Sequence, residues 1–145
     1  MRRKWLPAAA PAGALLVGAI MGTIHGVEAQ SATAIAIGAT SGPEESMMRR
    51  ALSEELGNLR RLRVTSERRA RWVLRGSVTR LDVQQDGDRN QIDCEVSLVV
   101  AERGNVRMML SGRAAARGAH VDRLRDSAIR AAVRGALRPL EQNLR

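Results

Sequence analysis

The sequence predicts an α+β fold with the element order β-α-β-β-β-β-α, in which two helices pack on one face of a mixed or mainly antiparallel sheet of about five strands. Two segments, residues 44–59 and 121–144, place apolar side chains at helical spacing. Between them lie strand-like segments separated by clusters of turn-forming residues, which is typical of an antiparallel meander. Residues 30–145 have a common size for independent folding, so we expect a single domain.

The first strand is predicted at residues 32–39, which are small or branched and carry no charge. Ser41 or Gly42 is expected to cap the following helix, with Pro43 at an early helical position. Two glutamates come next, in the first turn, where acidic side chains favour the helix dipole. The apolar stripe of this helix consists of Met48, Leu52, Leu56 and Leu59. One side of the helix therefore faces the core.

Four further strands follow from apolar runs and from alternation of apolar and polar residues. A short second strand starts at residues 62–64, and the third strand covers residues 71–84. Turn-forming residues 86–90 separate the third strand from the fourth, at residues 92–100. A second turn precedes the fifth strand, at residues 106–111. The last three strands are therefore expected to form the meander.

Cys94 is the only cysteine, which excludes a disulfide framework within one chain. It shares one face of the fourth strand with four apolar residues at alternate positions, so we expect it in the core. The alternative is an intermolecular disulfide or a redox site.

The last predicted helix covers residues 121–144 and should lie across the sheet. Pro139 falls inside this segment, and proline in a helix interior removes a hydrogen bond and clashes with the preceding turn. We therefore expect the helix to break near Arg138.

Residues 1–29 are typical of a cleavable secretory signal peptide. Basic residues 2–4 precede an apolar run at residues 8–24, and small residues near Ala29 offer a cleavage site before Gln30. The alternative is an uncleaved signal anchor, although two prolines and several glycines disfavour a stable membrane helix. No cysteine stands at the end of the apolar run, so the usual lipoprotein attachment point is missing. We expect a periplasmic or secreted protein with no transmembrane segment after cleavage.

The formal net charge of the chain is +9, and loss of three basic residues and one glutamate with the signal leaves +7. This charge favours anionic partners such as acidic proteins, anionic lipids or another polyanion. Nucleic acid is not expected, because base stacking needs aromatic platforms and the mature chain offers only Trp72. Arginine in place of lysine throughout the mature chain also fits a bias in coding composition.

No motif indicates catalysis, a metal or a cofactor. His120 is the only histidine after the signal, and we interpret it as a solvated residue near the start of the last helix. Residues 86–90 resemble the start of a calcium loop, but its glycine and its bidentate glutamate are missing, so we interpret them as a hairpin turn. Asp93 and Glu95 are expected to pair across strands with Arg75 or Arg107.

A row of arginines on the last helix is the candidate binding site for a partner. The row, which we call the arginine ridge, comprises Arg123, Arg130, Arg134 and Arg138. These residues lie opposite the apolar face, where guanidinium groups could bind carboxylates or phosphates. The alternative is an ordinary solvated helix face.

Residues 70–78 pair a small residue with an apolar run and a glycine before the meander. With the element order, this run resembles a compact domain of bacterial envelope proteins, found in TolB N-terminal modules, periplasmic activators of penicillin-binding proteins and curli-secretion lipoproteins. Arg71 stands where those domains often carry an acidic residue. The resemblance implies a non-catalytic binding module of the cell envelope. We expect it to act as an adaptor that binds another envelope protein. The alternative function is electrostatic binding of a polyanion or an anionic membrane through the arginine ridge.

Overall fold

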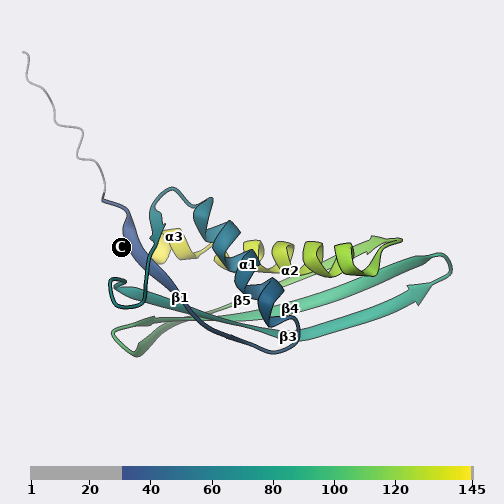
Figure 1. The fold of residues 1–145 in the computed structure, drawn as a ribbon, viewed down its shortest axis with the longest axis horizontal. Helices are drawn as coiled ribbons and strands as arrows, with labels where there is room; N and C mark the ends of the chain where they lie inside the picture. Colours follow the sequence, from purple (N-terminus) through teal and green to yellow (C-terminus); the bar gives the residue numbers. More distant parts are fainter. Residues whose placement is uncertain (1–30, 145) are drawn as a thin grey trace, which may run out of the picture.

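The computed structural model describes residues 31–144, so the predicted signal peptide at residues 1–29 lies outside the described residues. Figure 1 shows a long, curved sheet with helices on one side. The elements in chain order are β1 (Thr33–Ser41), α1 (Glu45–Gly57), β2 (Leu62–Val64), β3 (Trp72–Asp86), β4 (Arg89–Glu102), β5 (Asn105–Gly118), α2 (Val121–Leu137) and α3 (Leu140–Asn143).

The five strands form one mixed sheet in the order β2-β1-β3-β4-β5. β1 pairs in parallel with β2 and β3, whereas β3, β4 and β5 form an antiparallel meander. Both α1 and α2 lie on the same face of the sheet (Figure 1). The predicted α+β class and the β-α-β-β-β-β-α order are confirmed.

The core lies between the sheet and the two helices. From the sheet it takes alternate residues such as Leu74 and Leu98, and from the helices it takes residues such as Leu52 and Ile129, all without measurable exposure. Cys94 is 3% exposed and belongs to this core, as its position in the alternating strand predicted. Apolar and polar residues alternate along β4 in the sequence, and in the structure the apolar residues are the ones that are buried.

The two hairpins are longer than predicted. The five-residue turn expected at 86–90 is wrong, because β3 reaches Asp86 and β4 starts at Arg89, which leaves a two-residue turn. Gly87 takes a φ of 59° in this turn, a conformation that glycine adopts without strain. The fifth strand was expected to end at residue 111, but β5 continues to Gly118.

The second half of β5 pairs with β4, and α2 packs directly on it. A Cβ atom built on Gly112 would lie 2.0 Å from the carbonyl oxygen of Ala132 in α2. Glycine and alanine on this side of β5 therefore let the helix backbone approach the strand, in place of the large side chains that the alternation rule requires.

The two helices begin and end differently. Neither Ser41 nor Gly42 caps α1, because the helix starts at Glu45 and Glu44 occupies the N-cap with a left-handed backbone. Gly42 instead has a φ of 90° and packs against the backbone of Val78, where a Cβ atom would lie 2.5 Å from the carbonyl oxygen. The break predicted near Arg138 is confirmed, since α2 ends at Leu137 and the short helix α3 follows Pro139.

Candidate functional site

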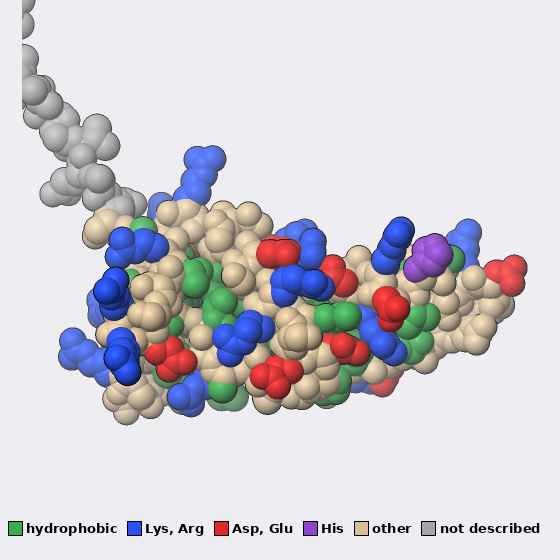
Figure 2. Space-filling view, in the orientation of Figure 1, with side chains coloured by type: hydrophobic (Ala, Val, Ile, Leu, Met, Phe, Trp, Pro, Cys, Tyr) green, Lys and Arg blue, Asp and Glu red, His purple; other side chains and the backbone are tan. Residues whose placement is uncertain are grey.

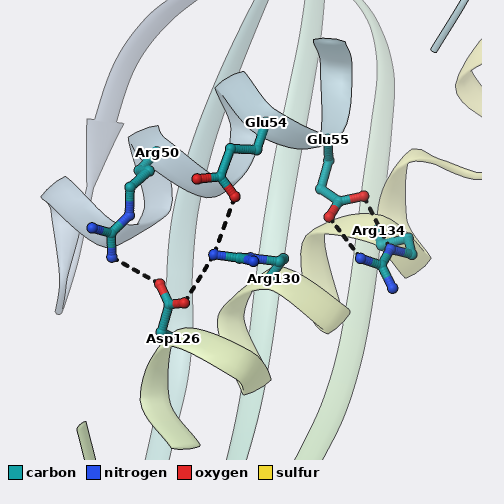
Figure 3. Close-up of polar contacts among 6 residues, drawn as sticks. All are labelled: Arg50, Glu54, Glu55, Asp126, Arg130 and Arg134. Atoms are coloured by element: carbon teal, nitrogen blue, oxygen red, sulfur yellow. Dashed lines mark hydrogen bonds and ion pairs between the residues drawn. The ribbon is translucent and has the colours of Figure 1, made fainter. Parts of the chain in front are cut away.

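The arginine ridge does not form a row of available cations, because α1 lies beside α2 and neutralises its centre. Arg134 donates two hydrogen bonds to Glu55 of α1, with distances of 3.0 Å from Nε and 2.9 Å from Nη2 (Figure 3). The Glu55 side chain is 7% exposed. The hydrogen bonds and charge of Glu55 raise the pKa of Arg134. This carboxylate is thus buried and satisfied by a paired guanidinium group.

Arg130 is also held within the protein. Its Nη2 atom lies 3.1 Å from Glu54 of α1 and 2.9 Å from Asp126 of its own helix, while Asp126 also accepts a hydrogen bond of 2.8 Å from Arg50 (Figure 3). The six residues drawn in Figure 3 form two separate ion-pair groups between α1 and α2: one of Arg50, Asp126, Arg130 and Glu54, the other of Glu55 and Arg134. We call the two groups together the helix–helix network.

The outer members of the ridge are placed differently. Arg123 and Arg138 are exposed, and neither forms an ion pair within residues 31–144. The sequence did not predict that the central arginines of the ridge are paired and the outer ones are not. Their partners Glu54 and Glu55 lie about 80 residues away, and the spacing of residues on one helix carries no information about the helix beside it. A partner for the whole ridge stays a prediction.

The acidic residues of β4 do not pair as expected. Glu95 contacts Arg113 of β5 at 3.1 Å, and Asp93 accepts hydrogen bonds from Gln91 of its own strand. The predicted partners, Arg75 and Arg107, are too far along the sheet, because the register places Arg75 opposite Val99. Arg107 instead binds Glu102 at 3.1 Å.

Cys94 lies in the core, whereas His120 lies on the surface. Burial raises the pKa of the Cys94 thiol to about 11, which keeps it protonated at neutral pH. His120 is exposed at the N-cap of α2, where its carbonyl accepts a hydrogen bond from Leu124. Across residues 31–144, no group of three or more histidine, cysteine or acidic side chains is arranged to hold a metal ion.

In the described part of the chain, no helix covers the face of the sheet opposite α1 and α2. Loop residues 65–71 cross beneath β1, where Glu67 approaches Gly38 and Ala36 is buried. Beyond that loop, we find no second layer over β3, β4 and β5 within residues 31–144. We call this region the open sheet face.

Three rows of side chains cross the open sheet face, in register from β3 to β5. In chain order of the strands, the rows are Val73, Ala101 and Val106; Arg75, Val99 and Met109; and Ser77, Ser97 and Ser111. Met109 is 73% exposed and Val106 is 60% exposed, and both are among the largest apolar exposures of the described residues.

One ion pair lies beside these rows on the open sheet face, where Glu95 contacts Arg113. Glu102 instead lies opposite the core residue Trp72, on the helix-bearing side of the sheet. There it accepts hydrogen bonds from Arg71 and Arg107, and these bonds lower the pKa of its carboxyl group. The open sheet face therefore combines apolar and hydroxyl side chains with Arg75 and one ion pair.

This arrangement defines a small α+β domain with one helix-covered and one open sheet face. No family model matches the chain, and no curated protein matches it. A minor lipoprotein from Acinetobacter baumannii has a similar structure, with a TM-score of 0.56 and 14% identity over 77% of this chain and 92% of that one. A candidate lipoprotein from Caulobacter crescentus gives 0.51 and 17% identity over 76% and 86% of the two chains.

At these identities the likeness shows the fold alone. The resemblance to bacterial envelope domains thus holds at the level of the fold, since both structures are described as bacterial lipoproteins. The narrower likeness to TolB modules, penicillin-binding-protein activators and curli-secretion lipoproteins is not confirmed. Within the described residues, no helix combines the length and apolar character needed to cross a membrane.

Proposed function

We propose that this protein is a non-catalytic accessory protein of the bacterial cell envelope that acts by binding another envelope protein through its open sheet face. The exposure of Met109 and Val106 on this face carries the proposal. Large apolar side chains gathered on a surface lose contact with water when a partner covers them, and each contributes about 1.5–3 kcal/mol on full burial.

The composition of the open sheet face supports a protein partner. Methionine and arginine are enriched in protein interfaces, whose centres are apolar and whose rims are polar. Here Met109 and Val99 lie in one row with Arg75, and the ion pair of Arg113 with Glu95 lies beside the rows. The three serines of the last row add hydroxyl groups that can donate to or accept from a partner.

The location in the envelope is supported by two independent observations. Residues 1–29 read as a secretory signal, and the fold is shared with two bacterial proteins described as lipoproteins. A role without catalysis is supported by the Cys94 thiol, which is buried in the core and whose pKa is raised by that burial, so that it stays protonated at neutral pH.

The experiment is capture of partners from an envelope extract by the tagged, exported protein, followed by reconstitution with each purified candidate. The double variant Val106→Ser with Met109→Ser removes the apolar centre without changing charge. Val83→Ser is the matched control, because Val83 is 45% exposed but lies on the helix-bearing side, opposite Ile92.

The proposal predicts one partner that remains bound at high salt and whose affinity for the double variant falls at least about tenfold, since two buried apolar side chains are lost. The control should bind as the original protein does. Equal binding of all three proteins would contradict the proposal, as would a mixture of partners that salt removes entirely.

A further inference from the structure

The described domain carries its net charge at one end. This end, which we call the basic end, is where β1 begins and where three segments meet: residues 58–71, 102–109 and 138–144. Thr33 at the start of β1 pairs with Leu62, and both Val64 and Trp72 lie level with Ile35, so the loop between them stays at this end. The turn at residues 103–104 lies at the same end, because it comes directly after Glu102, which pairs with Trp72 at the start of β3.

The C-terminal segment closes the same end. Arg60 and Arg61 line a hollow together with Glu141 and Leu144. On the other side, Arg71 and Arg107 line a hollow with Asn143. The short helix α3 thus lies between two groups of arginines that come from distant parts of the sequence.

Charge is strongly segregated between this end and the rest of the domain. The three segments hold nine arginines and three acidic residues, with six arginines in 58–71, two in 102–109 and one in 138–144. The remaining residues between 31 and 144 hold eleven arginines and eleven acidic residues. The basic end therefore carries +6 and the rest of the described domain is neutral. A bias towards arginine in the coding sequence explains the number of arginines but not this separation.

Most of these arginines are available to a ligand. Glu102 binds Arg71 and Arg107, but the other seven arginines of the basic end form no ion pair with any residue between 31 and 144. They are all exposed. Elsewhere in the domain, residues such as Arg50, Arg113 and Arg130 are paired with carboxylates. Figure 2 shows several arginines around the end where the grey segment joins the domain.

We infer that the basic end docks onto the phosphate headgroups of an anionic membrane surface. Among anionic partners, a membrane surface is favoured by the short distance in sequence between the apolar run and the domain. The apolar run ends at Ile24 and β1 begins at Thr33, so eight residues separate them. Eight residues span at most about 28 Å when fully extended. During export, before the predicted cleavage at Gln30, this short connection to the apolar run brings the basic end to the membrane surface. After cleavage, the arginines of the basic end alone hold the domain there.

Arginine suits this partner chemically. Each guanidinium group can donate two parallel hydrogen bonds to one phosphate, and it stays charged at any physiological pH. Several arginines on one surface add their attraction to a charged bilayer, and that attraction weakens as salt screens it. In this orientation, the turn between β3 and β4 points away from the membrane (Figure 1).

The test is sedimentation of the exported protein with vesicles of phosphatidylglycerol and phosphatidylcholine, and with vesicles of phosphatidylcholine alone, over a salt series. The triple variant Arg61→Glu, Arg68→Glu and Arg103→Glu changes the basic end. A matched control reverses Arg89, Arg117 and Arg123, which lie outside the three segments, by the same total charge. Thermal unfolding confirms that each variant is folded, and a second triple variant, of Arg60, Arg69 and Arg138, repeats the test independently.

The inference predicts binding to the anionic vesicles that fades with salt, at least about tenfold weaker binding of both basic-end variants, and little change in the control beyond the general loss of net charge. Equal binding to neutral vesicles would overturn it, as would equal losses in the basic-end and control variants. Binding to a soluble polyanion such as heparin without binding to anionic vesicles would also overturn it, and would identify a soluble partner instead.

Discussion

Replacing Gly112 by alanine tests the close packing of α2 on β5. The added Cβ atom would lie 2.0 Å from the carbonyl oxygen of Ala132 and 2.9 Å from the amide nitrogen of Ala136. Because carbon and oxygen atoms at rest are about 3.5 Å apart, α2 would have to move away by more than about 1 Å. Overpacking of this kind costs about 1–3 kcal/mol, and a clash with backbone atoms belongs at the upper limit.

We therefore expect Gly112→Ala to lower the free energy of unfolding by about 3 kcal/mol, and the Tm by about 12 °C at roughly 4 °C per kcal/mol. The assay is thermal and urea unfolding followed by circular dichroism. Gly135→Ala is the control, because no atom lies within 4 Å of the new Cβ atom and alanine favours a helix by about 0.5–1 kcal/mol. A stability for Gly112→Ala equal to that of the original protein would refute the packing argument.

Three further predictions follow from individual side chains. Burial raises the pKa of Cys94 from about 9 to about 11, so its contribution to stability should be complete below pH 9 and be lost as the pH rises to 11. The chain has no tyrosine and one lysine, Lys4, so few other side chains titrate between pH 9 and 11. In Cys94→Ala, the free energy of unfolding measured with urea should therefore depend less steeply on pH in this range. Arg134→Met should lower the Tm more than Arg123→Met does, because it leaves the buried Glu55 without its partner, and equal values would argue against the helix–helix network. Arg103 has a φ of 50° in the turn before Gly104, so Arg103→Asn should raise the Tm slightly, and a fall would show that this turn is formed differently.

Local periodicity was sufficient to predict most of the fold. The alternation from Ile92 to Val100 and the helical spacing from Met48 to Leu56 each describe a face that is buried as expected. The effect of Pro139 on the last helix was also predictable, because it depends on one residue and its immediate neighbours.

Features that depend on contacts between distant segments were not predictable. A register shift between Val78 and Arg80 lets Leu81 face the helices beside Cys94, although simple alternation assigns that side to Arg80. The second half of β5 pairs with β4 and lies under α2, but its small residues carry little strand signal of their own.

The candidate site shows the same limit. The spacing of the arginine ridge was visible in the sequence, but the carboxylates of Glu54 and Glu55 that neutralise its centre come from another helix. The basic end was equally hidden, because its arginines belong to three segments that only the sheet topology brings together.

The most direct test of the proposed function is photo-crosslinking in intact cells, with a photoreactive amino acid placed in turn at Met109 on the open sheet face and at Arg123 on α2. The proposal predicts one discrete adduct from position 109, formed with an envelope protein, and none from position 123. An adduct from position 123 alone would show that the partner binds the helical face and would contradict the role of the open sheet face.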